Sequence, residues 1–210
     1  MIIYLIRHGQ TNANLKKIFC GYTDVKLNSN GKKEVRRLRR NLSDICDIDI
    51  CDENKKIRKI YCSDRFRAIE TAKILFPERR IKKLPGLSEI HLGIFEGMTI
   101  EQIEMQYPSQ YREWMRKQLR FNFPEGECYQ GFKRRVLSSY KQILSNMISM
   151  NDDDAVVVVT HGGTISMILN YIMKSDNFFK YLPANASVSK LEIIKKRNTK
   201  TILHFFGKTL

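Results

Sequence analysis

The chain of 210 residues has no long hydrophobic run. Its longest purely apolar stretches, at 2–6 and 155–159, are short, whereas a membrane-spanning helix needs about 20 apolar residues. The N-terminus has no basic region ahead of its apolar run and no small-residue cleavage site after it, so no secretory signal is predicted. We therefore expect a cytoplasmic protein with no membrane partner.

The sequence also lacks the cysteine patterns of disulfide and metal frameworks. The cysteines are Cys20, Cys46, Cys51, Cys62 and Cys128. Their number is odd, and they form no C-x-x-C pair and no Cys/His ligand pattern. We interpret them as reduced thiols, as is typical of a reducing compartment. The motifs G-x-x-x-x-G-K-[ST], G-x-S-x-G and H-E-x-x-H are absent as well.

Negative charge is scarce. Asp and Glu total 22 against 37 Lys and Arg, which gives a formal charge of +15. Such an excess favours acidic partners through long-range steering, whether phosphorylated metabolites, nucleic acid or anionic lipid. The cations gather in short clusters such as residues 32–40, which we assign to the solvated face of a helix because blocks of like charge are commonly plain surface. No nucleic-acid partner is therefore expected.

The sequence does contain enough apolar residues for a core, and three short strands of one design. Hydrophobic residues make up 42% of the chain, too many for a disordered one, and the length favours a single domain over residues 1–210. The strand-like runs are 2–6, 57–62 and 155–159. Such runs alternating with helical stretches are typical of a parallel sheet covered on both faces. The predicted fold is α/β, a three-layer α/β/α arrangement with a mostly parallel central sheet.

Each of these strands stops at a polar cluster. The clusters are Arg7-His8-Gly9, Ser63-Asp64-Arg65 and Thr160-His161-Gly162. In parallel sheets, ligands bind beyond the carboxyl ends of the strands. We therefore predict that five side chains meet around one crevice: Arg7, His8, Ser63, Arg67 and His161.

The other segments complete the expected layers. Apolar stripes at helical spacing predict helices at 31–42, 100–107, 110–119 and 131–150. Residues 85–127 carry glycines and prolines around the two middle helices, and we interpret them as an excursion that covers the crevice. Residues 187–194 and 201–206 are predicted to form a β-hairpin on the sheet edge, around a turn at 195–200.

A histidine beside a fixed cation and a glycine suits attack on a phosphoryl group, and His8 has this setting. Neutral imidazole is nucleophilic near pH 7, and nearby guanidinium groups disfavour a further positive charge. A strand-end histidine alone is more often structural, but His161 stands at a helix start, where free N–H groups bind anions. With the forked donors of Arg7 and Arg67, the set predicts a phosphate cage. The leaving oxygen also needs an acid to protonate it, and a carboxylate of the excursion would serve. The residues alone do not determine whether this acid is Glu89, Glu96 or Glu101.

Five short motifs follow one another along residues 1 to about 190. They are Leu5-Ile6-Arg7-His8-Gly9-Gln10-Thr11 with Asn14; Gly21, Asp24, Leu27 and Gly31; Ser63-Asp64-Arg65-Phe66-Arg67-Ala68; Leu87-Ser88-Glu89 with Gly93 and Phe95-Glu96-Gly97; and Thr160-His161-Gly162-Gly163. This order resembles the histidine phosphatases, also called the phosphoglycerate mutase-like superfamily. One motif is weak evidence, whereas five in order are specific.

The resemblance implies a phosphomonoester hydrolase that needs no metal and no cofactor and acts on a small phosphorylated metabolite. His8 would become phosphorylated, with Arg7, Arg67 and His161 binding the phosphoryl oxygens. Glu89 would protonate the leaving alcohol and then activate water. The motif assigns the second phosphate-binding arginine to Arg67 and not to Arg65. The expected substrate- or phosphate-binding residues are Asn14, Gly21, Tyr22, Thr23 and, at the helix start, Gly162.

Two positions depart from the family's pattern. Relatives often have Gly-Glu-Ser where this chain has Gly126-Glu127-Cys128, and Gly131 replaces an acidic residue. Cys128 and Arg134 also match the C-x5-R spacing of cysteine-dependent phosphatases. No apolar strand leads into this cysteine, and the stretch lacks the amides and the activating partner that a reactive thiolate needs, so we reject that assignment.

Three other functions stay open at this point. A cofactor-dependent phosphoglycerate mutase would return the phosphoryl group to a second hydroxyl, but the excursion here is compact, which favours a phosphatase. A relative without activity would bind phosphorylated ligands, and a basic protein of another kind would bind nucleic acid. The sequence determines neither the oligomeric state nor the substrate, for which α-ribazole phosphate, sugar phosphates, phosphoglycerates and phosphoserine are candidates.

Overall fold

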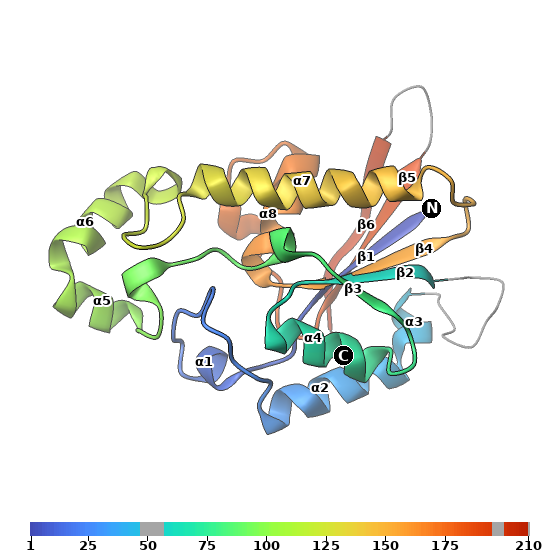
Figure 1. Cartoon of the computed structure of the whole chain (residues 1–210), viewed down its shortest axis with the longest axis horizontal. Coiled ribbons are helices and arrows are strands. Elements are labelled where there is room, and N and C mark those ends of the chain that lie inside the picture. The colour runs from blue at the N-terminus through green and yellow to red at the C-terminus, as the bar shows by residue number, and fades with distance from the viewer. Residues whose placement is uncertain (47–56, 195–199, 210) are drawn as a thin grey trace.

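The computed structural model describes residues 1–46, 57–194 and 200–209, in which one six-stranded sheet lies between layers of helices (Figure 1). The strands are β1 (Ile2–Arg7), β2 (Ile57–Cys62), β3 (Ile81–Lys83), β4 (Ala155–Thr160), β5 (Val188–Ile194) and β6 (Lys200–Lys208). The helices are α1 (Asn12–Leu15), α2 (Ser29–Arg40), α3 (Leu42–Cys46), α4 (Phe66–Leu75), α5 (Ile100–Gln106), α6 (Pro108–Lys117), α7 (Tyr129–Met147) and α8 (Gly162–Met173). Short 3-10 helices are η1 (Pro85–Leu87), η2 (Gly93–Phe95), η3 (Gln118–Arg120) and η4 (Phe178–Tyr181).

The strand order β3-β2-β4-β1-β5-β6 brings distant parts of the sequence to one edge of the sheet. The first four strands in this order run parallel to one another. Strand β5 is antiparallel to β1, and β6 is antiparallel to β5. The register pairs Arg7 with Thr160 and Cys62 with Val159, so β1, β2 and β4 end side by side. The residues that follow these ends therefore become neighbours, and the prediction of a mostly parallel α/β sheet is confirmed.

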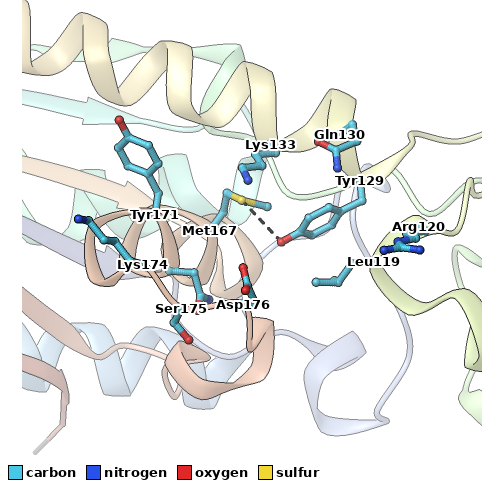
Figure 2. Close-up of a pocket in the computed structure, with 11 residues that line it drawn as sticks. Leu119, Arg120, Tyr129, Gln130, Lys133, Met167, Tyr171, Lys174, Ser175 and Asp176 are labelled. Atoms are coloured by element: carbon cyan, nitrogen blue, oxygen red, sulfur yellow. Dashed lines mark hydrogen bonds between the residues drawn. The ribbon is translucent and has the colours of Figure 1, made fainter.

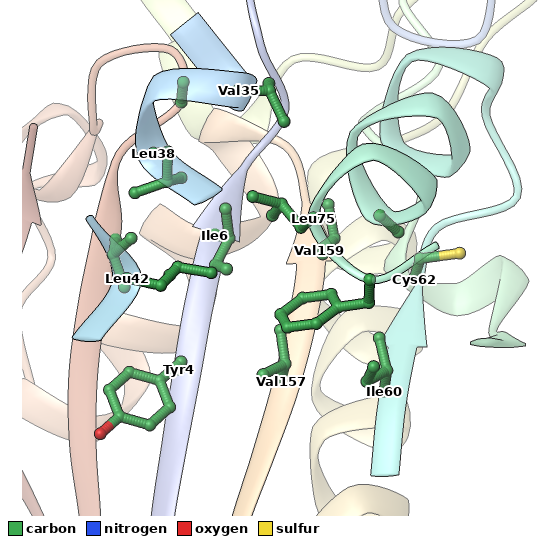
Figure 3. Close-up of a cluster of buried hydrophobic side chains, with 14 of the residues drawn as sticks. Tyr4, Ile6, Val35, Leu38, Leu42, Ile60, Cys62, Leu75, Val157 and Val159 are labelled. Carbon is green, nitrogen blue, oxygen red and sulfur yellow. The ribbon is translucent and has the colours of Figure 1, made fainter. Parts of the chain in front are cut away.

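Both faces of the central strands β1 and β4 are buried, which explains their continuous apolar sequences. On one face Ile6 and Val159 pack with Leu75 of α4 and Val35 of α2 (Figure 3). On the other face, Val158 belongs to the cluster made with α7 and α8. Because successive strand residues point to opposite faces, a strand covered on both sides has no polar alternation. Burying one such side chain contributes roughly 1.5–3 kcal/mol.

The boundaries of several elements differ from the predicted ones. The helix expected at 31–42 spans Ser29–Arg40, because Asn28 caps it through its side chain, and the one expected at 131–150 spans Tyr129–Met147. Strand β3 and helix α3 were not predicted, since runs of three and five residues carry little periodic signal. The hairpin is present as β5 and β6, with β6 at the sheet edge. Residues 195–199 of its turn lie outside the described residues.

The excursion, residues 85–127, has a small core of its own. Phe95 lies at its centre, completely buried and stacked on Phe121 at 6.0 Å between ring centroids. Its buried members are Leu92, Phe95, Ile103, Phe121 and Phe123. Helices α5 and α6 lie together at one end of the molecule (Figure 1). Across the described residues, every helix is too short or too polar to span a bilayer.

Candidate active site

Two buried histidines face each other beyond the ends of β1 and β4. His8 is 4% exposed and His161 is fully buried, and their ring centroids are 5.2 Å apart. The backbone N–H of His8 donates to the carbonyl of Thr160 at 3.0 Å, which continues the strand pairing into the polar clusters. The sheet edge thus brings together two residues separated by 153 positions (161 − 8). We call His8 and His161, together with Arg7, Arg67 and Glu89, the histidine site.

His8 is arranged to act as a nucleophile. Its Nδ1 lies 2.8 Å from the carbonyl oxygen of Gly9, which only accepts, so Nδ1 carries the hydrogen and the Nε2 lone pair is free. Burial, followed by the charges of Arg67 and Arg7, holds the pKa of His8 well below its usual range. The imidazole is therefore neutral at pH 7, which is the form that attacks phosphorus.

His161 is held in the opposite tautomer to His8. The Nε–H of Arg67 donates to its Nδ1 at 3.2 Å, so Nε2 carries the hydrogen and donates to Ser63 Oγ at 2.7 Å. Burial, with the charges of Arg67 and His8 next, keeps the pKa of His161 well below its usual range. In this arrangement the N–H of His161 points to Ser63, the third strand-end residue of the predicted crevice.

Arg7 has donors to spare. Its Nη1 donates to the carbonyl of Pro183 at 2.6 Å, while its buried Nε has no hydrogen-bond partner among the described residues. Its guanidinium lies against Gly162, where an added Cβ would approach Cζ to 3.3 Å. A buried donor without an acceptor is costly, and a phosphoryl oxygen would satisfy it. Gly162 thus leaves the space that this arginine occupies.

Arg67 is tied to the loop at residues 20–24. It is 2% exposed, and its Nη groups donate to the carbonyls of Gly21 at 2.6 Å and Thr23 at 3.0 Å. Its neighbour Arg65 pairs with Asp64 at 2.8 Å and donates to the carbonyl of Tyr22 at 3.0 Å. Arg67 is therefore the arginine next to the histidines, while Arg65 lies at the outer side of the loop.

Glu96 holds the amides of the same loop. Its carboxylate accepts from the backbone N–H groups of Gly21, Tyr22 and Thr23 at 2.8–3.1 Å and from the Thr23 hydroxyl at 2.8 Å. Burial alone would raise the pKa of Glu96, but the hydrogen bonds from Tyr22, Leu92 and Thr23 outweigh it and lower that pKa. The loop therefore has its amides on Glu96 and its carbonyls on the two arginines, which anchors it from both sides.

Of the three candidate acids, Glu89 is the one at the histidine site. Its Oε2 accepts from the N–H of Gly163 at 2.8 Å, in the first turn of α8, and its Oε1 accepts from Ile90 at 3.0 Å. An added Cβ on Gly163 would lie 2.4 Å from Oε1, so this glycine leaves room for the carboxylate. Glu96 is committed to the loop, and Glu101 is exposed on α5.

Asn14 is linked to the histidine site through Asn185, and Tyr22 belongs to the loop at residues 20–24. Asn14 forms a capping box with Thr11 at the start of α1, and its Oδ1 also accepts from Asn185 at 3.3 Å. Asn185 donates as well to the carbonyl of His8 at 3.2 Å. The ring of Tyr22 lies 4.8 Å from that of His91. Asn185 gave no signal in the sequence analysis, because its partners are 177 and 171 positions away.

The departures at Cys128 and Gly131 have a local explanation. Cys128 is the N-cap of α7, and its Sγ accepts from the N–H of Gly131 at 3.3 Å. In a capping box, this third helical position carries an acidic residue that returns a second hydrogen bond. Here the box is reduced to one weak bond. Arg134 is exposed within the same helix, so the C-x5-R stretch forms no anion-binding loop.

Arg135 is another residue near Glu89 that the sequence patterns did not single out. It donates to both carboxylate oxygens of Glu127 at 2.8 and 2.7 Å and to the backbone carbonyls just before and at Glu89. Arg135 stands two helical turns after the Gly-Glu-Cys segment that begins α7. An acidic residue followed by an arginine eight positions later was the available signal.

A cavity lies between α7, α8 and η3 (Figure 2), and it shares no lining residue with the histidine site. Across the described residues, no group of three His, Cys, Asp or Glu side chains is arranged to hold a metal ion. The cysteines Cys20, Cys62 and Cys128 are free thiols.

Comparisons with known proteins agree on one family. The model of the histidine phosphatase superfamily (branch 1) matches residues 3–204. Phosphoglycerate mutase-like protein 4 of Arabidopsis thaliana is 29% identical over 167 residues, which are 78% of this chain and 67% of that protein. A broad-specificity phosphatase of Saccharomyces cerevisiae is 27% identical over 199 residues, 92% of this chain and 80% of that protein. The crystal structure of the α-ribazole phosphatase from Shigella flexneri has a TM-score of 0.85 at 20% identity, covering 99% of this chain and 96% of that one. The chain therefore belongs to the histidine phosphatase superfamily, branch 1.

Proposed function

We propose that the chain hydrolyses phosphomonoesters of small metabolites through a phosphohistidine on His8. The observation that carries this proposal is the pairing of a neutral His8, with its Nε2 lone pair free, with Arg7, whose buried Nε lacks a partner among the described residues. A phosphoryl group bound there would meet the attacking nitrogen of His8 and would supply the acceptor that Nε of Arg7 lacks. The relatives named as phosphatases support the same class of substrate.

In the first step, Nε2 of His8 forms a bond to phosphorus while the bond from phosphorus to the leaving oxygen breaks. The guanidinium groups of Arg7 and Arg67 stabilise the charge that develops on the equatorial oxygens. Glu89 donates a proton to the leaving oxygen, so the product is a neutral alcohol. In support, its carboxylate accepts from the N–H of Gly163 in the first turn of α8, the helix that His161 precedes.

In the second step, the same carboxylate takes a proton from water, and the water oxygen attacks phosphorus. The bond between Nε2 and phosphorus breaks, inorganic phosphate leaves, and His8 returns to its neutral form. The hydrogen bond from Nδ1 to Gly9 keeps the ring in one tautomer through both steps.

We propose further that this reaction needs no metal ion and that residues 1–210 act as one domain. Two arginines at the site supply the positive charge that a divalent ion provides in metal-dependent phosphatases. The family match over residues 3–204 supports the single domain. A mutase would instead transfer the phosphoryl group to a second hydroxyl of the substrate. Release of inorganic phosphate, with no interconversion of phosphoglycerates, separates the two activities.

The test is to trap the intermediate. A brief pulse of labelled substrate followed by acid-free denaturation should leave label on the wild-type chain, and this label should be lost in acid because phosphohistidine is acid-labile. His8→Ala should abolish both turnover and labelling while the thermal midpoint stays close to that of the wild type. Acid-stable label on Cys128, or turnover by His8→Ala, would overturn the proposal.

A further inference from the structure

The side chain of Arg135 has every N–H committed. Its Nε and Nη2 donate to the two carboxylate oxygens of Glu127 at 2.8 and 2.7 Å, and Nη2 also donates to the carbonyl of Glu89 at 2.8 Å. Its Nη1 donates to the carbonyls of Ser88 at 2.6 Å and Gly86 at 3.2 Å. These contacts use all the donors that a guanidinium has. The residue therefore has no N–H left for a substrate.

The partner Glu127 holds the chain on the other side of Glu89. Its backbone N–H donates to the carbonyl of His91 at 2.9 Å, and the backbone nitrogen of His91 lies 3.5 Å from its Oε2. The ion pair is partly buried, with side-chain exposures of 22% for Arg135 and 19% for Glu127. A bidentate pair fixes both side chains in one geometry. Together they clamp the segment 86–91, in which Glu89 lies.

The clamped segment links α7 to α8 through Glu89. The carbonyls of Ser88 and Glu89 accept from Arg135 in α7, and the carboxylate of Glu89 accepts from the N–H of Gly163 in α8. Lysine at position 135 would keep the charge but lose the fork, because an ammonium cannot donate to a carboxylate and three carbonyls in one plane.

We propose that Arg135, locked by Glu127, is a positioning residue that holds Glu89 within proton-transfer reach of the leaving oxygen. This inference rests on the proposed function, in which Glu89 is the acid. Since a general acid contributes typically about 10² to 10⁴ in rate and matters least when the leaving oxygen departs without a proton, a displaced Glu89 should slow poor leaving groups selectively.

The experiment compares kcat and KM for an alkyl phosphate and for p-nitrophenyl phosphate in Arg135→Lys and Glu127→Gln, with Arg134→Lys as the matched control on the exposed neighbour. Both clamp variants should lower kcat for the alkyl phosphate by about 10²-fold. With p-nitrophenyl phosphate, the rate constant of the phosphorylation step should change by less than about threefold. KM should stay nearly unchanged for both substrates. The control should match the wild type.

An equal loss on both substrates, or no loss, would overturn the inference, because a merely structural role moves both rates together. Glu89→Gln is measured alongside. If Glu89→Gln slows the alkyl phosphate selectively and the clamp variants do not, the positioning role of Arg135 is wrong while Glu89 remains the acid. If Glu89→Gln slows both substrates equally, the assignment of Glu89 as the acid is wrong, and so is the positioning role that depends on it. Having two clamp variants keeps the test decisive if one of them does not fold.

Discussion

Replacing Glu96 by Gln tests whether a carboxylate holds the 20–24 loop against Arg67. Oε1 of Glu96 accepts from the backbone of Tyr22 at 2.8 Å and of Leu92 at 3.1 Å, and Oε2 accepts from the N–H and the hydroxyl of Thr23 at 3.1 and 2.8 Å. Glutamine keeps the shape of the side chain but replaces one oxygen by an NH₂ group. If Oε1 is replaced, the NH₂ group faces the N–H groups of Tyr22 and Leu92; if Oε2 is replaced, it faces the N–H groups of Gly21 and Thr23. In both cases two backbone donors face a donor.

The size of the effect follows from these contacts. A hydrogen bond to a charged group contributes about 1.5–3 kcal/mol, so two of them amount to about 3–6 kcal/mol in a dry site. Glu96 is only partly buried and water can reach the loop, so we expect about 2–3 kcal/mol of lost loop stability. Because 1.4 kcal/mol is a factor of ten, kcat/KM should fall about 30- to 150-fold as the carbonyls of Gly21 and Thr23 leave Arg67.

The assay is kcat/KM for p-nitrophenyl phosphate together with the thermal midpoint, for Glu96→Gln and for the exposed control Glu101→Gln. Because the pKa of Glu96 is lowered on folding, its carboxylate stabilises the fold above the usual glutamate pKa of about 4.5, and this contribution is lost as pH falls through the lower folded value. The stability difference between Glu96→Gln and the wild type should therefore shrink below pH 4.5. Unchanged kcat/KM in Glu96→Gln would refute the anchoring role, and a loss confined to poor leaving groups would make Glu96 the acid.

Three further predictions concern the metal-free site, the two buried histidines and the N-cap of α7. Excess EDTA should leave activity within about twofold of its starting value, since arginines supply the charge at the site; a large loss that one divalent ion restores would contradict the metal-free mechanism. His8 and His161 stay neutral in the fold because burial lowers their pKa values, so the unfolded chain takes up protons first and the urea midpoint should fall as pH drops below about 6.5; a midpoint that does not change between pH 7 and 5.5 would count against buried neutral rings. Cys128→Ser should raise the thermal midpoint by a degree or two, because a hydroxyl is the better N-cap acceptor, and a lower midpoint would show that the thiol is there for another reason.

The amino-acid sequence by itself determined the sheet and the ends of its strands. The runs 2–6 and 155–159 are apolar at every position, which is stable only between two covered layers. Because parallel strands end at a common edge, the polar residues after them had to lie close together. The meeting of His8 with His161 was therefore predictable from local patterns, even though 153 positions (161 − 8) separate them.

The tertiary structure decided how each of the three candidate carboxylates is held. Glu89, Glu96 and Glu101 lie within 13 positions (101 − 89 + 1), and composition and spacing do not distinguish them, so that only the family motif selected Glu89. Their roles depend on partners far away in the chain: Gly163 for Glu89 and the loop at residues 20–24 for Glu96. Arg135 is recognised only by the carbonyls that it faces. Hydrogen bonds between distant segments depend on side-chain direction, and this is fixed by packing, which local sequence patterns do not encode.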